Sequence, residues 1–445
     1  MRAFLYRKEP MKTNTPNRAP RTFEGGPALV GTPIQELERT VLACMLWESS
    51  FYESGEDVAD RIKRLVPLCA PSDVMALAVK ARGPMRLRHA PLLIVRELAR
   101  HPGKPVIDDV LCDVIQRADE LSEFLALYWA DGRTPIASGV KRGLARAFRK
   151  FNAYHLAKYN RDNAVKLRDV LFLVHAKPKD DEQAQVWRQL VDGTLPAPDT
   201  WEVALSSGSD KAETFSRLLS ENKLGYMALL RNLRNMADAG VDEQAVRTAL
   251  IDGSAKSKAL PFRYVAAARA VPQWEPMIDE AMQIAMAGMA KLPGRSVVLV
   301  DVSGSMADRL SAKSDLTRLD AACALAVLVR GIAESARVFS FSNSLVEVPA
   351  RTGMALVDAI RTSQPNHGTY LGEAVNAVAK AVPDLDRLIV ITDEQSADAV
   401  GAPPGRGYMI NVAGYQRGVG YGRWTKISGF SEAVIQYIEA LENQR

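Results

Sequence analysis

The spacing of apolar residues divides the chain into two parts. Over roughly the first 290 residues the apolar positions recur at the three- and four-residue spacing of amphipathic helices, and strand-like alternation does not interrupt the pattern. The segments with this pattern are 35–47, 58–65, 72–81, 92–100, 106–117, 121–129, 166–175, 215–219, 227–236, 243–251, 264–271 and 277–291. Short connections without a strict sequence period predict a degenerate α-helical repeat that curves into a solenoid.

The last third of the chain has a different pattern, in which continuous apolar runs alternate with helical segments. The predicted strands are 297–300, 337–341, 387–391 and 408–412, and the predicted helices are 316–333, 370–382 and 431–442. This order is typical of a doubly wound α/β sheet with strands buried on both faces. Ligands of such sheets bind at the carboxyl ends of the strands.

Length and composition allow two or three domains. The chain has 445 residues, of which 47% are apolar and 24% charged, as in an ordinary globular protein. We predict a flexible tail over residues 1–22, a helical-repeat domain over 23–290 and an α/β domain over 291–445. The tail contains basic residues and prolines but no apolar core, so it does not resemble a secretion signal.

Cysteine usage and hydropathy indicate the compartment. The four cysteines are scattered among apolar neighbours without a C-x-x-C pair, which is typical of reduced core residues in a cytosolic protein. No stretch reaches the 18 or more apolar residues of a membrane span. We therefore predict a cytoplasmic protein without a membrane partner.

Oxygen-bearing side chains gather at the predicted ends of two strands and at the start of one helix. Asp301 ends the first strand and is followed by Ser303 and Ser305, Thr369 precedes the helix at 370–382, and Asp393 ends the strand at 387–391. Carboxylates and hydroxyls suit a hard cation such as Mg²⁺. An Asp and two Ser after a strand also form an ordinary helix N-cap, so the three loops together carry more weight than the first alone.

These five positions resemble the metal-ion-dependent adhesion site of von Willebrand factor A domains, and none of the five is substituted. The resemblance implies that Asp301, Ser303, Ser305 and Thr369 ligate Mg²⁺ directly or through water. It also implies that Asp393 acts mostly through water and that a carboxylate of a partner often completes the shell.

The basic charge is concentrated in the helical part. Residues 291–445 contain 16 Lys and Arg against 16 Asp and Glu, so the net charge of +5 belongs to the preceding residues. The segment 141–168 contains a single acid, Asp162, and nine basic residues: Lys141, Arg142, Arg146, Arg149, Lys150, Lys158, Arg161, Lys166 and Arg168. A nucleic-acid backbone is the natural partner of such a cluster, and a solvated helix face is the simpler alternative.

Helical repeats with a basic segment, followed by this metal-site domain, are similar to the Ro ribonucleoprotein family and its TROVE module. The resemblance rests on residues 39–55, 143–159, 166–178, 228–236 and 260–264, which occur in the family's order. It implies a monomeric ring of HEAT-like repeats closed by the von Willebrand A domain. A basic central cavity would take single-stranded ends of misfolded noncoding RNAs, and a small Y-like RNA would bind outside.

The same resemblance assigns roles to individual residues. Lys158 and His175 map onto family positions that contact Y RNA, with Arg161 and Arg168 as neighbours in the segment. His175 has a structural alternative as a core residue near a helix end. Bacterial relatives take part in RNA surveillance beside exoribonucleases, so the implied role is binding without catalysis.

Two other classes of function compete with this interpretation. A two-metal nuclease would need carboxylates that bridge ions roughly 3.5 to 4 Å apart, whereas this site offers hydroxyls and two carboxylates around one ion. A metal-site protein adaptor or co-chaperone without RNA would explain residues 291–445 but leaves the basic segment unused. The glycine-rich stretch 405–422 is consistent with either a partner surface or an ordinary loop.

Overall fold

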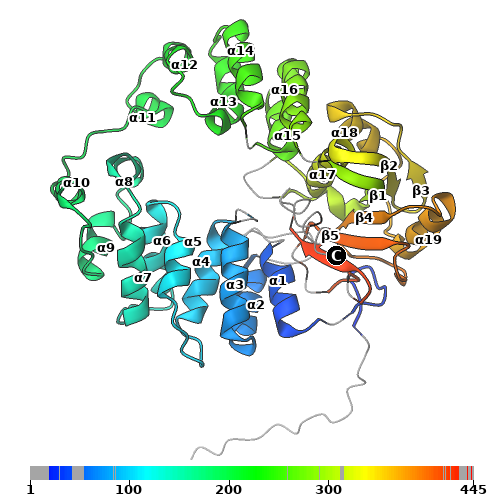
Figure 1. Cartoon of the computed structure of the whole chain (residues 1–445), viewed down its shortest axis with the longest axis horizontal. Helices are drawn as coiled ribbons and strands as arrows, with labels where there is room; N and C mark the ends of the chain where they lie inside the picture. Colours follow the sequence, from blue (N-terminus) through cyan, green and yellow to red (C-terminus); the bar gives the residue numbers. More distant parts are fainter. Residues whose placement is uncertain are drawn as a thin grey trace, which may run out of the picture.

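The computed structural model describes residues 20–29, 31–42, 55–83, 85, 87–257, 259–289, 291–310, 315–413, 415, 417–420, 422–429, 438 and 442. Its helices follow one another around an arc, and an α/β domain closes the arc into a ring (Figure 1). Within the described residues, no helix is both long enough and apolar enough to cross a membrane.

The first part of the described chain is entirely helical apart from its connections and isolated bridges. Its helices are α1 (Pro33–Leu42), α2 (Gly55–Leu65), η1 (Val66–Leu68), α3 (Pro71–Arg82), α4 (His89–Leu98), α5 (Asp108–Val114), α6 (Asp119–Tyr128), α7 (Ser138–Phe148), α8 (Ala153–Tyr159), α9 (Leu167–Leu173), α10 (Asp181–Asp192), α11 (Trp201–Ser206), α12 (Lys211–Ser220), α13 (Tyr226–Asp238), α14 (Glu243–Ser254), α15 (Pro261–Ala270), η2 (Pro272–Trp274) and α16 (Glu275–Ala287). Helices two apart in sequence pack together, as α5 does on α7, α4 on α6, α13 on α15 and α14 on α16. This packing confirms the predicted helical repeat.

Helices α10 (Asp181–Asp192) and α11 (Trp201–Ser206) were not among the segments predicted from the periodicity. Helix α10 has clear terminal signals, because Asp180 caps its first turn by accepting from Gln183 N and Gly193 ends it at φ 72°. Helix α11 has only six residues and buries none of them fully, so it leaves little periodic signal. The part of the predicted helix 35–47 beyond residue 42 lies outside the described residues.

The second part is a sheet in the order β3-β2-β1-β4-β5-β6. Its strands are β1 (Leu292–Asp301), β2 (Ala333–Phe341), β3 (Leu345–Glu347), β4 (Arg387–Thr392), β5 (Arg406–Asn411) and β6 (Thr425–Ser428). All neighbours are parallel except β2 and β3. The predicted doubly wound α/β fold is thus confirmed, whereas β3, β6 and α18 (Gly353–Arg361) were not predicted.

Alternate residues of the strands point into two separate cores. Val298 and Val300 of β1 face the core that holds α17 (Arg318–Ile332) and α18, and Val297 and Leu299 face the core that holds α19 (Leu371–Ala381). Continuous apolar strands are therefore required, because both faces are covered. Most of the predicted helix 431–442 lies outside the described residues, although Ile438 is described and buried.

The ring closes where α1 packs on β6. Arg39 of α1 is 1% exposed and its Nη1 lies 2.8 Å from Glu394 Oε2, which follows β4. Its Nε and Nη2 donate to the carbonyl oxygens of Tyr415 and Arg417, at 2.6 and 2.8 Å. Each of the three nitrogens of this guanidinium thus donates to the α/β domain.

Glycines in the predicted glycine-rich stretch make this contact possible. A Cβ on Gly418 would lie 2.0 Å from Arg39 Nη1, so only glycine lets the guanidinium approach the backbone here. Gly420 N donates to Glu394 Oε2 at 2.6 Å. Gly418 and Gly420 of this stretch therefore contact the two members of the Arg39–Glu394 ion pair.

The residues before α1 extend the same interface. Thr22 Oγ1 donates to Ser396 O at 2.7 Å, and Phe23 N donates to Gln395 Oε1 at 2.8 Å. Residues 20–22 of the predicted tail are thus held against the loop after β4, and residues 1–19 lie outside the described residues.

We expect Arg39→Met to lower the free energy of unfolding by about 3–5 kcal/mol, because it leaves the Glu394 carboxylate buried without its partner. Urea unfolding followed by circular dichroism would measure the change. Arg247→Met is the matched control: its pair with Glu280 is 41% and 45% exposed, and exposed pairs contribute at most about 1 kcal/mol. Equal effects of the two substitutions would contradict the role given to Arg39.

Candidate metal centre and basic surface

The first loop of the predicted metal site follows β1 directly. Asp301 Oδ1 accepts a hydrogen bond from Ser303 N at 2.9 Å, and the Ser303 and Ser305 hydroxyl oxygens lie 3.5 Å apart. The short helix η3 (Gly304–Ala307) turns the chain immediately after the strand, so these oxygens stay together at the strand end. All three side chains are buried.

The other two loops are tied to the first through the backbone. Gly304 N donates to His367 O at 3.1 Å, and Ala397 N donates to Thr369 O at 2.7 Å. Thr392, which ends β4, donates from Oγ1 to Asp301 Oδ2 at 2.5 Å. Strands β1 and β4 are neighbours where the strand order reverses, the place at which such sheets bind ligands.

Two carboxylates are fully buried in this cluster. Burial, reinforced by the Asp393 carboxylate, raises the pKa of Asp301 to about 7. Burial also raises the pKa of Asp393, although the guanidinium groups of Arg318 and Arg39 oppose the increase. A divalent cation between the two carboxylates would relieve this repulsion.

One atom of the cluster is unsatisfied. Asp393 Oδ1 accepts from Gln395 N at 3.1 Å, whereas Asp393 Oδ2 is buried and has no hydrogen-bond partner among the described residues. The described residues contain no cluster of three or more His, Cys, Asp or Glu that could hold a metal. The hydroxyls would therefore have to complete the shell, and this donor set fits Mg²⁺.

The site is supported by residues that the sequence did not indicate. Arg318 at the start of α17 hydrogen-bonds to the Tyr415 hydroxyl, lies over the Tyr415 ring at 4.9 Å and pairs with Asp308 at 3.3 Å. Glu394, next to Asp393, takes the left-handed conformation at φ 62°. Burial opposes ionisation of Glu394, but the Arg39 guanidinium outweighs it and holds the pKa of Glu394 below its usual value.

The part of the basic segment 141–168 that lies in α7 is partly neutralised by acids of α5. Arg142 Nε lies 3.5 Å from Asp108 Oδ2, and Arg146 Nη1 lies 3.6 Å from the same oxygen. Arg146 also pairs with Asp109. These acids lie outside the basic segment in sequence, so the segment alone overstates the positive charge of the surface.

The next two predicted RNA-binding residues hold neighbouring elements together. Arg149 Nε donates to Lys177 O at 2.7 Å. Lys150 Nζ donates to Cys112 O at 2.6 Å and to Ile115 O, the carbonyl groups at the end of α5. Burial lowers the pKa of Lys150. The Lys150 ammonium thus caps a helix, as cations at helix C-termini do.

The remaining predicted RNA-binding residues line α7, α8, α9 and their connections. Lys141 is half-buried, and Lys158 Nζ lies 3.5 Å from Glu202 Oε1. Arg161 and Arg168 are exposed, and Arg168 Nε lies 3.9 Å from Asp169 Oδ1. His175 is exposed at φ 53° just after α9, which excludes the alternative that it is a core residue.

Comparisons with known proteins agree with the overall fold. A family model of the TROVE domain matches residues 193–291, which contain α11 to α16. The RNA-binding protein RO60 of Deinococcus radiodurans is 24% identical over 415 residues, covering 78% of each protein. This chain resembles the Ro family. The crystal structure of the D. radiodurans RO (RSR) protein matches with a TM-score of 0.60 and 20% identity, covering 92% of this chain and 99% of that one.

These findings confirm the predicted Ro resemblance and the predicted fold class of this Ro-like chain. The TROVE match covers the second half of the helices and not the basic segment 141–168. The assignment of individual residues to metal and RNA therefore stays a prediction.

We expect Mg²⁺ to stabilise the protein, because its binding would neutralise the two buried carboxylates. At a hundredfold excess over Kd the increase would be about 2.7 kcal/mol. Without metal, the folded state holds a proton on Asp301 up to a pKa of about 7 instead of 3.8, so stability should fall as the pH rises from 3.8 to about 7. Thermal unfolding with and without Mg²⁺, from pH 5 to pH 8, would measure both effects.

Asp301→Asn is the informative variant. It removes one of two adjacent buried charges, so the metal-free protein at pH 8 should be no less stable than wild type, and the shift with Mg²⁺ should disappear. Asp384→Asn is the control, because Asp384 is 61% exposed in its pair with Arg295. An undiminished Mg²⁺ shift in Asp301→Asn would exclude this site.

Proposed function

We propose that the chain is an RNA-binding protein that takes single-stranded ends of misfolded or structured noncoding RNAs, together with a small Y-like RNA. The observation that carries the proposal is the closed ring, which matches the fold of the RO (RSR) protein over 92% of this chain. The relative named RNA-binding protein RO60 supports the same class of ligand. Its place would be RNA quality control in the cytoplasm, beside an exoribonuclease that supplies the hydrolysis.

The exposed cations of α7 to α9 support an electrostatic interface. Arg161 and Arg168 are exposed, and they lie close in sequence to Lys158 and His175. Arg142 and Arg146 keep exposed side chains despite their acidic partners, so a phosphate can compete for them. We therefore assign the phosphate contacts first to the connection between α8 and α9 and to α9 itself.

The metal site would serve binding and not chemistry. Asp301, Ser303, Ser305 and Thr369 would hold one Mg²⁺, with Asp393 in the outer shell. When bound, the ion would supply an open coordination position for an acidic group of a partner. A single ion with mostly hydroxyl ligands lacks the paired, carboxylate-bridged metals of a two-metal nuclease.

The test is binding of a labelled structured RNA with a single-stranded 3′ tail, compared with a blunt RNA of the same duplex, across a salt series. We expect tail-dependent affinity that falls steeply with salt. The double variant Arg161→Ala, Arg168→Ala should reduce the slope of log K against log salt by about 1.4, because about 0.7 is lost per single-strand phosphate contact. Fluorescence anisotropy would give both affinity and slope.

The matched control is Arg217→Ala with Arg247→Ala, which removes two arginines of similar exposure from α12 and α14. It should leave the slope unchanged. Failure of the wild type to bind either RNA at physiological salt would overturn the proposal and favour a metal-site protein adaptor. Equal losses in both double variants would show that charge alone, and not this surface, matters.

A further inference from the structure

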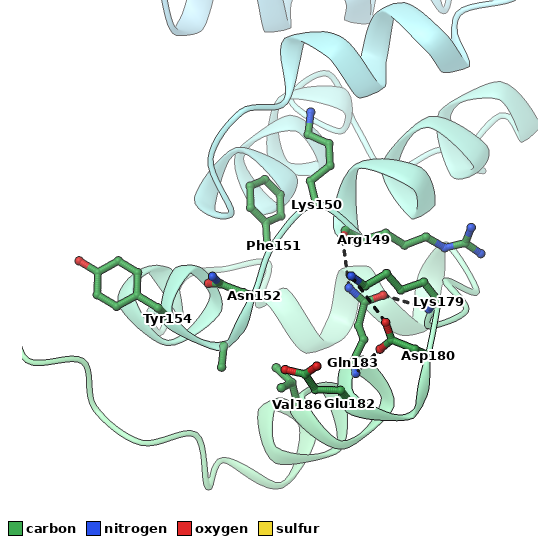
Figure 2. A pocket seen from close by; sticks show the side chains of 11 residues that line it. Arg149, Lys150, Phe151, Asn152, Tyr154, Lys179, Asp180, Glu182, Gln183 and Val186 are labelled. Carbon is green, nitrogen blue, oxygen red and sulfur yellow. Dashed lines mark hydrogen bonds and ion pairs between the residues drawn. The ribbon is translucent and has the colours of Figure 1, made fainter. Parts of the chain in front are cut away.

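A pocket of ≈ 360 Å³ lies between the end of α7, the start of α8 and the start of α10. Figure 2 shows Tyr154 and Asn152 of the α8 side and Glu182 of the α10 side around it, with Arg149 and Lys179 at its other end. The volume is within the range of small-molecule sites. Two of the predicted RNA-binding residues, Arg149 and Lys150, belong to its lining, whereas no predicted role involves Asn152, Tyr154 or Glu182.

The lining of the pocket includes a buried and hydrogen-bonded glutamine, Gln183. Gln183 is 7% exposed, and its side chain donates to Arg149 O at 3.0 Å and accepts from Lys179 N at 3.1 Å. Phe151, which is 4% exposed, and Val186 complete the apolar part of the lining. The hydrogen bond to Arg149 O joins α10 to the end of α7 at the pocket.

Several polar groups at the rim have no protein partner. Within the described part of the chain, the Glu182 carboxylate and the Tyr154 hydroxyl form no hydrogen bond or ion pair. Asn152 uses its Oδ1 to accept from His155 N at 3.0 Å, which leaves its amide NH₂ available. The Tyr154 side chain is 47% exposed, and Lys158 Nζ lies over its ring at 5.9 Å from the centroid.

These groups select the class of ligand. A phosphate is disfavoured, because Asp180, Asp181 and Glu182 surround the first turn of α10. A planar ligand with hydrogen-bond donors fits better, since it can stack on Tyr154 and donate to Glu182. Such ligands include unpaired nucleobases, which proteins read by aromatic stacking and by hydrogen bonds to their edges.

We propose that this pocket binds one unpaired guanine of a single-stranded RNA. Guanine alone among the four bases places two adjacent donors, N1–H and N2–H₂, beside an acceptor, O6. The two oxygens of the Glu182 carboxylate accept from the donors, and the Asn152 amide donates to O6. Arg149 and Lys179 attract the flanking phosphates. This inference rests on the proposed RNA binding and gives it a base preference.

The experiment uses the full chain and labelled oligouridine decamers that carry one central G, A, C or U. We expect the G decamer to bind about tenfold more tightly than the others, as a bidentate base contact gives. Glu182→Gln should abolish this preference and leave affinity for the all-U decamer unchanged. Tyr154→Leu should weaken binding of the G decamer about fivefold, because it removes the ring on which the base would stack.

Glu243→Gln is the matched control, because Glu243 is an exposed carboxylate in the first turn of α14, as Glu182 is in α10. It should keep the preference for G. Equal binding of all decamers by the wild type, or a preference that survives in Glu182→Gln, would overturn the guanine pocket while RNA binding stands. Binding of no decamer and no tailed RNA would overturn RNA binding as well.

Discussion

The buried ion pair between Arg39 and Glu394 joins parts of the chain that are 355 residues apart. An isolated charge in this position would be strongly unfavourable, so each partner is tolerated only because the other is present. The guanidinium is further satisfied by the carbonyl groups of Tyr415 and Arg417. The position of α1 against the sheet, and with it the closure of the ring, depends on this arrangement.

The same contact sets the environment of the candidate metal site. Glu394 follows Asp393 directly, so the ion pair between Arg39 of α1 and Glu394 also holds the loop that contains Asp393. Arg39 and Arg318 place positive charge near a carboxylate that nevertheless retains a raised pKa because of burial. The nearby arginines Arg39 and Arg318 thus do not fully compensate the two buried carboxylates of Asp301 and Asp393. A small divalent cation, as we propose for this site, would supply the remaining positive charge.

The basic surface shows a different balance. Its arginines and lysines are exposed or form part of helix contacts, and acids from α5 reduce the charge of α7. The cations that could attract an RNA backbone therefore adjoin a pocket lined by the Tyr154 ring and the Glu182 carboxylate. Affinity and base preference would therefore come from different residues, the first from charge and the second from the shape and hydrogen bonding of the pocket.

The sequence determined most of the helices and the four strands β1, β2, β4 and β5, because apolar periodicity reflects burial directly, but it missed α10, α11, α18, β3 and β6. It also predicted that Asp301, Ser303, Ser305, Thr369 and Asp393 form one metal site, since strand ends in such a sheet converge. It did not reveal Arg39, Glu394 or the acids that neutralise Arg142 and Arg146. Those pairings join residues far apart in the chain, and ion pairs have no periodic signature. Only the tertiary structure decided them, because it alone determines which charges share a low-dielectric space.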